Sequence, residues 1–114
     1  MVLRTKLQHL RSKAKFKKLI KEYEKVIIVA GRMCPICSSM YPIFEHLDEI
    51  HDDIEIRDWD YDLKSADMIR EMPETEDFWT LPFVLYFRNG EIVEAHAGKK
   101  SSSDIKKIIQ DNFS

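Results

Sequence analysis

Residues 26–37 read VIIVAGRMCPIC, an apolar run that leads through a glycine into a pair of cysteines. A short apolar run followed by Gly31 is typical of a buried strand that ends in a turn. Apolar residues recur at helical spacing after Cys34, and Pro35 suits a first helical turn, where its missing N–H costs nothing. This stretch therefore predicts a buried strand, a turn and a helix that begins at the cysteine motif.

The position of the two cysteines predicts reactive thiols. A thiol at a helix N-terminus faces unpaired backbone N–H groups and the positive end of the helix dipole, and both favour the thiolate. Cys37 follows Cys34 by one turn, close enough to close a small disulfide ring. Two cysteines in 114 residues would make a poor disulfide scaffold. We interpret the pair as a reversible redox couple.

Length and composition predict one compact domain over residues 1–114, since 44% of the residues are hydrophobic. No apolar run approaches the ~20 residues of a membrane span, and no N-terminal segment resembles a signal peptide. We expect a soluble, cytoplasmic monomer in a reducing compartment, with no membrane association.

The first 21 residues carry eight Lys and Arg and no acid, whereas the net charge of the whole chain is −2. Phe16, Leu19, Ile20 and Tyr23 form an apolar stripe within this basic stretch, which suits a helix packed on a sheet. We expect a solvated basic face and no nucleic-acid partner. The alternatives are a docking surface for an acidic partner or nucleic acid, and an organelle-targeting segment.

The rest of the chain alternates between strand and helix patterns. Strands are predicted at 26–30, 54–58, 83–87 and 91–97, and helices at 12–24, 34–51, 63 to about 72, and about 101–113. Residues 5–10 fit either a strand or a helix. Asn89-Gly90 predicts a tight hairpin. Strands separated by helices indicate parallel pairing, and the hairpin adds an antiparallel edge. The prediction is an α/β fold: one central mixed β-sheet flanked by helices on both faces.

Three features together resemble the thioredoxin superfamily over nearly the whole chain. The first is the Cys-Pro-Ile-Cys motif after an apolar strand. The second is Leu81-Pro82 before the strand at 83–87, in the position of the cis-proline of that family. The third is the ending, in which residues 87–91 read FRNGE and Gly98 precedes a final amphipathic helix. The resemblance implies a thioredoxin-like fold.

The resemblance also implies roles for single residues. Cys34 would be the exposed, attacking thiolate and Cys37 the buried, resolving thiol. Pro82 would face the disulfide, and Leu81 would offer backbone hydrogen bonds to an extended substrate segment. Met33, Pro35 and Ile36 complete the surface expected to contact substrate. No metal or cofactor is implied.

Several positions depart from the family pattern. Met33 replaces the usual tryptophan before the first cysteine, and proline directly follows Cys34, as in the Cys-Pro-Tyr-Cys of glutaredoxins. On an ungapped comparison, the buried Asp and the Lys that move protons in thioredoxins become Ile28 and Ile56. Because these residues cannot act as acid or base, we expect slower turnover than in a standard thioredoxin.

The loop through Glu74–Trp79 is longer than usual, and we expect it beside the active site, with Trp79 as a candidate substrate contact. The remaining polar candidates are interpreted as surface or packing residues without metal ligation. They are the histidines His9, His46, His51 and His96, and the acids Asp58, Asp60 and Asp62, which we expect at a solvated strand end. Trp59 is expected to pack in the core.

The leading functional hypothesis is a thiol–disulfide oxidoreductase of the protein disulfide reductase type. Its partners would be disulfide-containing client proteins and a reductase that supplies electrons. The alternatives are a glutathione-linked, glutaredoxin-like enzyme, a binding module whose cysteines hold a metal or an iron–sulfur cluster, and a redox-inactive adaptor.

Overall fold

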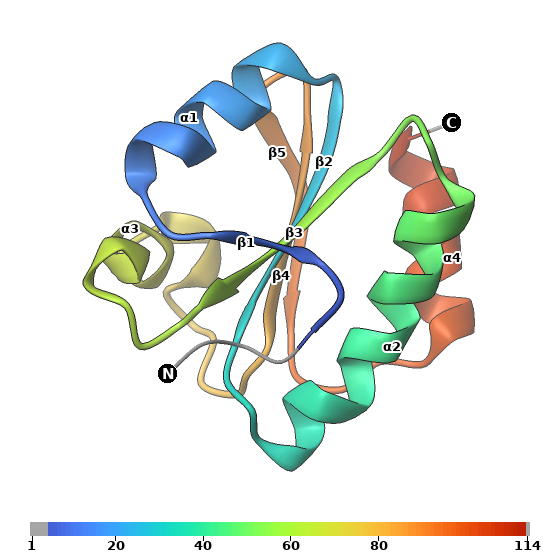
Figure 1. The fold of residues 1–114 in the computed structure, drawn as a ribbon. Helices are drawn as coiled ribbons and strands as arrows, with labels where there is room; N and C mark the ends of the chain where they lie inside the picture. The colour runs from blue at the N-terminus through green and yellow to red at the C-terminus, as the bar shows by residue number, and fades with distance from the viewer. Residues whose placement is uncertain (1–4, 114) are drawn as a thin grey trace.

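The computed structural model describes residues 5–113 and contains a five-stranded sheet with helices on both of its faces (Figure 1). The strands are β1 (Gln8–Leu10), β2 (Lys25–Gly31), β3 (Glu55–Asp60), β4 (Phe83–Arg88) and β5 (Glu91–Ala97). The α-helices are α1 (Lys13–Glu22), α2 (Pro35–Ile50), α3 (Asp67–Arg70) and α4 (Ser102–Phe113), and two 3-10 turns are η1 (Lys64–Ala66) and η2 (Pro73–Thr75). The predicted α/β fold with a mixed sheet is confirmed.

The strand order is β1-β3-β2-β4-β5, so the longest apolar strand, β2, lies at the centre. Strands β1 and β2 both pair with β3 in parallel, whereas β4 runs antiparallel to β2 and to β5. The expectation that helix-separated strands pair in parallel was wrong for β3 and β4. These two strands are not neighbours, because the chain passes over β2 through η1, α3 and η2 before it enters β4 in the opposite direction.

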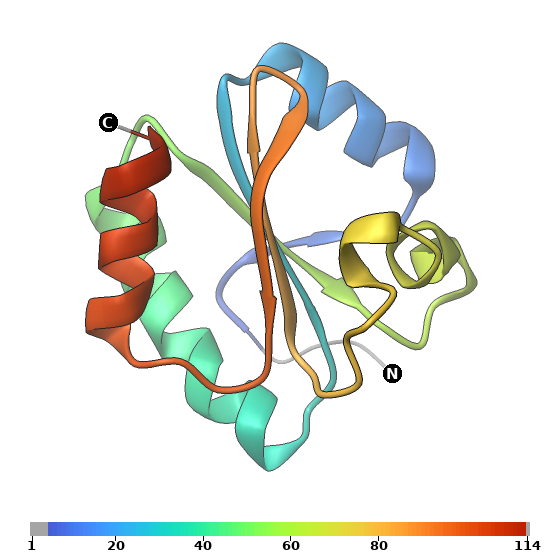
Figure 2. The same cartoon turned by 180° about the vertical axis from the view of Figure 1, so that it is seen from behind.

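Two apolar layers hold the helices against the sheet (Figures 1 and 2). Helices α2 and α4 cover one face, where the core includes Phe44, Ile105 and Phe113. Helices α1 and α3 cover the other face, where Phe16 packs on Trp59. All of β2 except Lys25 is buried, as expected for a strand with helices on both sides.

The N-terminal segment forms the short edge strand β1, one of the two structures that the sequence allowed. Ser12 then caps helix α1, where its hydroxyl accepts a hydrogen bond from the backbone N–H of Lys15 at 3.2 Å. Phe16 and Leu19 face the core, while the lysines of α1 are exposed. The lysines of the basic stretch that belong to α1 therefore lie on the outer face of that helix, as predicted.

Strand pairing at the centre of the sheet brings the cysteine motif beside the proline. Ala30, near the end of β2, pairs with Phe83, the first residue of β4. The segments that flank these residues, 31–37 and 81–82, therefore meet at one end of the sheet, at the start of α2 (Figure 1). Over residues 5–113, none of the helices has the length and apolar character needed to cross a membrane.

Candidate functional site

Cys34 is the residue at which the turn after β2 becomes helix α2. Its backbone is extended, with φ −91° and ψ 163°, and its Sγ accepts a hydrogen bond from the backbone N–H of Cys37 at 3.3 Å. Pro35 occupies the first helical turn. Cys34 is therefore the N-cap of α2, and the predicted start of the helix at this motif is confirmed.

Cys37 lies behind Cys34 and is fully buried. The backbone N–H of Arg32 donates a hydrogen bond to its Sγ at 3.5 Å. Burial raises the pKa of the Cys37 thiol to about 12, because the cost of a buried charge outweighs the effect of this N–H donor. Cys37 is accordingly an uncharged thiol at neutral pH.

Cys34 has the opposite electrostatic environment. Partial burial by itself would raise its pKa, but hydrogen bonds from the Cys37 thiol and from the backbone N–H groups of Cys37 and Ile36 outweigh this effect. They hold the pKa of Cys34 below its ordinary value of 9.0. The more exposed sulfur of the pair therefore ionises first, and this arrangement places a nucleophile at the surface with a second thiol behind it.

Pro82 approaches the cysteine pair from the start of β4. The Leu81–Pro82 peptide bond is cis, Pro82 is buried and Leu81 is half-buried. A Cβ placed on Gly31 would lie 3.0 Å from the Sγ of Cys37 and 3.3 Å from the Cβ of Pro82. Pro82 and Cys37 thus meet over the same glycine, as the sequence led us to expect.

The rim of the site is formed by side chains with very different exposure. Ile36 is 40% exposed, Pro35 is exposed, and Met33 is half-buried against the core beneath α2. Trp79 is 91% exposed and borders a hollow of about 390 Å³ between the 77–80 loop and the end of β5. This hollow reaches Gly98, whose N–H donates a hydrogen bond to the carbonyl of Pro82 at 3.1 Å. The 77–80 end of the long loop therefore lies near Pro82, and its position beside the cysteines stays a prediction.

A cluster of charged and aromatic side chains holds the turn before Cys34. Arg32 forms an ion pair with Asp62 at 2.7 Å, which lowers the pKa of that carboxyl, and its guanidinium lies 5.3 Å from the centre of the Tyr61 ring. Arg70 lies 5.2 Å from the same ring and pairs with Asp67 at 2.6 Å. The β2–α2 turn is thus tied to the segment that follows β3.

The interpretation of Asp58 as a solvated acid was wrong. Asp58 is fully buried in β3, where its carboxylate accepts a hydrogen bond from Thr5 and lies 2.6 Å from Nδ1 of His9. Burial raises the pKa of this carboxyl. The alternation of Ile54, Ile56 and Asp58 carried this information, because all three residues point to one face of the strand.

His96 has a packing role, one of the two that the sequence allowed, but it is not isolated, because it has a specific buried partner. It is 7% exposed, and its Nε2 lies 2.9 Å from the hydroxyl of Tyr86. Its Nδ1 has no hydrogen-bond partner among residues 5–113. Burial, with a smaller effect from the charge of Lys100, lowers the pKa of His96 to about 4. His96 is therefore a neutral part of the core.

Ile28 and Ile56, the positions compared with the proton-moving residues of thioredoxins, are both fully buried. They lie in different layers: Ile28 belongs to the core under α1 and α3, and Ile56 to the core under α2 and α4. Neither side chain can exchange a proton, and of the two only Ile56 shares a layer with Cys37; the slower turnover stays a prediction.

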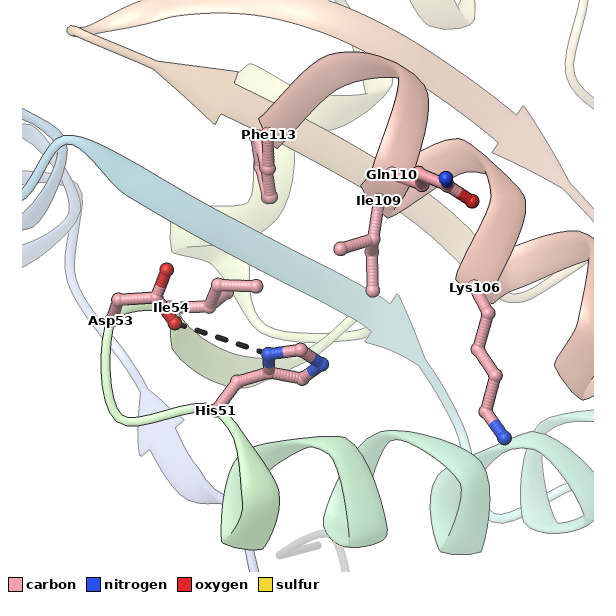
Figure 3. Close-up of a pocket in the computed structure, with 7 residues that line it drawn as sticks. All are labelled: His51, Asp53, Ile54, Lys106, Ile109, Gln110 and Phe113. Atoms are coloured by element: carbon pink, nitrogen blue, oxygen red, sulfur yellow. Dashed lines mark ion pairs between the residues drawn. The ribbon is translucent and has the colours of Figure 1, made fainter.

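A second hollow lies at the opposite end of α2 from Cys34 (Figure 3). It has a volume of about 320 Å³ between the end of α2 and helix α4, with Ile54, Ile109 and Phe113 as its apolar wall. His51 and Asp53 form an ion pair at 3.9 Å on its border. Within residues 5–113, no group of three or more His, Cys, Asp or Glu side chains is placed to hold a metal ion.

Sequence reasoning missed one side chain of the site, Tyr41. Its hydroxyl donates a hydrogen bond to the carbonyl of Arg32 at 2.9 Å, and the residue is 3% exposed. A signal for it existed, since residues four apart lie on the same face of a helix and Tyr41 follows Cys37 by four.

Comparison with known proteins agrees with this geometry. The sequence model of the Thioredoxin family matches residues 7–111. A thioredoxin of Mycoplasmoides gallisepticum is 21% identical over 105 residues, which cover 91% of this chain and 100% of the relative.

Solved structures of thioredoxins share the fold. Mitochondrial thioredoxin 3 from Saccharomyces cerevisiae superimposes with a TM-score of 0.77 at 23% identity, covering 92% of this chain and 94% of that chain. A mutant thioredoxin from Halobacterium salinarum gives a TM-score of 0.80 at 17% identity, covering 100% of this chain and 96% of that chain. The two-layer arrangement of helices around a mixed sheet is therefore common to all three proteins.

Proposed function

Because the chain belongs to the thioredoxin family, we propose that it is a dithiol–disulfide oxidoreductase that reduces disulfides in client proteins with Cys34 and Cys37. The observation that carries this proposal is the difference between the two thiols. One is accessible with a lowered pKa, and the other is buried with a raised pKa directly behind it. This asymmetry is what an attacking and a resolving cysteine require.

The first step is attack by the Cys34 thiolate on a client disulfide. A bond forms between the Cys34 sulfur and one client sulfur, the client S–S bond breaks, and the second client sulfur leaves as a thiolate that takes up a proton. The N–H groups at the start of α2 stabilise the attacking thiolate. The product is a mixed disulfide between the client and Cys34.

In the second step Cys37 loses its proton and attacks the Cys34 sulfur. The Cys34–Cys37 disulfide forms, the bond to the client breaks, and the client is released with two reduced thiols. Since burial raises the pKa of Cys37 to about 12, deprotonation of this thiol is the demanding part of the cycle. We expect it to limit turnover, because Ile28 and Ile56 offer no proton acceptor and the proton must pass to water, to the substrate or to another residue.

Substrate contact is assigned to the rim. Leu81, next to the buried Pro82, would present its backbone to an extended client segment. Met33, Pro35 and Ile36 would form the apolar surface around Cys34, and Trp79 would extend that surface along the 77–80 loop. Exposed aromatic and aliphatic side chains around a nucleophile suit an unfolded or flexible client better than a small polar substrate.

We propose that the protein acts in the cytoplasm as a monomer, without a bound cofactor, as part of electron transport to protein disulfides and of redox homeostasis. A separate reductase would return electrons to the Cys34–Cys37 disulfide. The exposed lysines of α1 would form a solvated face and bind no nucleic acid.

A glutathione-linked, glutaredoxin-like activity is the second candidate, and the position of Pro35 directly after Cys34 favours it. The electron donor separates the two functions. Turnover with glutathione and glutathione reductase, and none with thioredoxin reductase, would replace the first proposal by the second.

The proposed function is tested by oxidation of the folded protein followed by trapping of free thiols. We expect a single intramolecular disulfide whose reduction potential is near or below that of the cytosolic thiol pool. Cys34→Ser should abolish exchange with a protein disulfide, and Cys37→Ser should accumulate the mixed disulfide. If oxidation gives no intramolecular disulfide, the proposal fails.

A further inference from the structure

We propose that Tyr41 is a positioning residue for the resolving step, in that its hydroxyl holds the Arg32 backbone so that the Arg32 N–H faces the sulfur of Cys37. This inference rests on the proposed exchange reaction. It concerns the second step of that reaction and leaves the attack by Cys34 unaffected.

The first observation is a pair of hydrogen bonds that meet at one residue. The Tyr41 hydroxyl donates to the carbonyl oxygen of Arg32 at 2.9 Å, and the backbone N–H of Arg32 donates to Sγ of Cys37 at 3.5 Å. Cys37 and Tyr41 lie on the same face of α2. Helix α2 thus carries both the Cys37 sulfur and the hydroxyl that fixes Arg32, whose N–H donates a hydrogen bond to that sulfur.

The second observation is the close packing of Tyr41 and Cys37 over Gly31. A Cβ at this glycine would lie 2.8 Å from the Tyr41 hydroxyl oxygen, which is too close for a real side chain, and 3.0 Å from the Cys37 sulfur, which is closer than most real Cβ contacts. The backbone of Gly31 does not have a positive φ. A glycine is therefore needed here for space, because the hydroxyl and the sulfur occupy the position that a Cβ would fill.

The same turn is held at two further points. The carbonyl of Gly31 accepts a hydrogen bond from the N–H of Tyr61 at 2.9 Å, and the Arg32 side chain donates to Asp62. These contacts hold the turn from the side of β3, and Tyr41 holds it from the side of α2. Removal of the Tyr41 hydroxyl takes this donor away from the Arg32 carbonyl and leaves the turn held from the side of β3.

Tyr41 itself does not accept the proton of Cys37. Burial raises the pKa of the phenol well above its ordinary value, so the hydroxyl remains a hydrogen-bond donor. The proton of Cys37 passes to a base in solution, such as a buffer base or hydroxide. The resulting thiolate forms in a dry site, where an aligned N–H donor stabilises it more than in water.

An aromatic disulfide, dithiobis(nitrobenzoate), separates the two steps in one experiment. Attack by Cys34 forms a mixed disulfide and releases one coloured nitrothiobenzoate. Attack by the Cys37 thiolate on the Cys34 sulfur then forms the Cys34–Cys37 disulfide and releases the second. The two cysteines lose two electrons and two protons, and the reagent gains two electrons. The first phase depends on reagent concentration, whereas the second is intramolecular.

We expect Tyr41→Phe to slow the second phase about threefold to tenfold at every pH below the pKa of Cys37, with the first phase unchanged. This range corresponds to partial loss of one charge-assisted hydrogen bond. Tyr86→Phe is the matched control, because it removes another buried hydroxyl, bonded to His96 instead of the turn. It should leave both phases as in the unmodified protein.

Gly31→Ala provides an independent test. Its Cβ would displace the hydroxyl and the sulfur, so it should slow the second phase by itself. Combined with Tyr41→Phe it should slow that phase less than the product of the single effects, because the clash with the hydroxyl is gone. An unchanged second phase in Tyr41→Phe, or an equal effect of Tyr86→Phe, would overturn the inference. If the unmodified protein released no second nitrothiobenzoate, the proposed function itself would fail.

Discussion

Limited alkylation of the reduced protein should label Cys34 almost alone. The pKa of Cys34 lies below 9.0 and that of Cys37 at about 12, so the two values differ by more than about three units. At a pH below both values, the thiolate fraction of Cys34 exceeds that of Cys37 by a factor of about 1,000 or more. Intrinsic nucleophilicity partly offsets this factor, because a more basic thiolate reacts faster, with a Brønsted slope of about 0.4–0.5. The net preference for Cys34 is then at least about 30- to 60-fold.

The complete burial of Cys37 should increase this preference further, since the reagent must reach the sulfur. The assay is reaction with a limiting amount of iodoacetamide near neutral pH, digestion, and quantification of each labelled cysteine by mass spectrometry. Protein unfolded in denaturant is the control and should label both cysteines at similar rates. Labelling of Cys37 within a few-fold of Cys34 in the folded protein would refute the argument from burial and hydrogen bonding.

Three further predictions address other parts of the molecule. Because burial lowers the pKa of His96 to about 4, the unfolded chain binds its proton first as the pH falls. The free energy of unfolding should therefore drop by about 3 kcal/mol between pH 6.5 and pH 4 and then level off. Denaturant unfolding at a series of pH values should show a smaller drop for His96→Gln. An equally large drop in this variant would exclude His96 as the cause. Asp58→Asn should lower the free energy of unfolding by about 1–3 kcal/mol, since it removes a buried carboxylate bonded to Thr5 and His9. Hydrogen exchange of the β1 backbone amides should become faster. Unchanged protection of these amides would contradict the assigned contacts. Trp79→Ala should leave stability within about 0.5 kcal/mol because the side chain is 91% exposed. It should raise the KM for a protein disulfide roughly fivefold, with the small aromatic disulfide as the control substrate. An unchanged KM for the protein disulfide would exclude Trp79 from the binding surface.

The elements were predictable where one local signal was sufficient. The apolar run at 26–30 predicted the buried strand, the Asn89-Gly90 pair predicted the hairpin, and Pro35 predicted the start of α2. Each of these signals lies within a few residues of the structure that it specifies. The position of the cysteine pair at the start of a helix was predictable for the same reason.

The errors concern properties that depend on distant residues. The direction of β4 depends on how the chain crosses β2, and no short pattern encodes that path. The burial of Asp58 depends on Thr5 and His9, which precede it by about fifty residues. The contact between Tyr41 and Arg32 depends on a turn that places a helix beside the strand before it.

The pairing of Ala30 with Phe83 places the reactive end of the molecule on β2 and β4, two of the three inner strands of the sheet. Inner strands open last when a protein fluctuates, and strands at the margin open first. Mutations that loosen β1 should therefore leave the distance between the thiols and Pro82 unchanged, whereas β5 also holds Pro82 through the N–H of Gly98. The β1 edge of this sheet can vary in sequence, or accept insertions, without disturbing the chemistry at the cysteines.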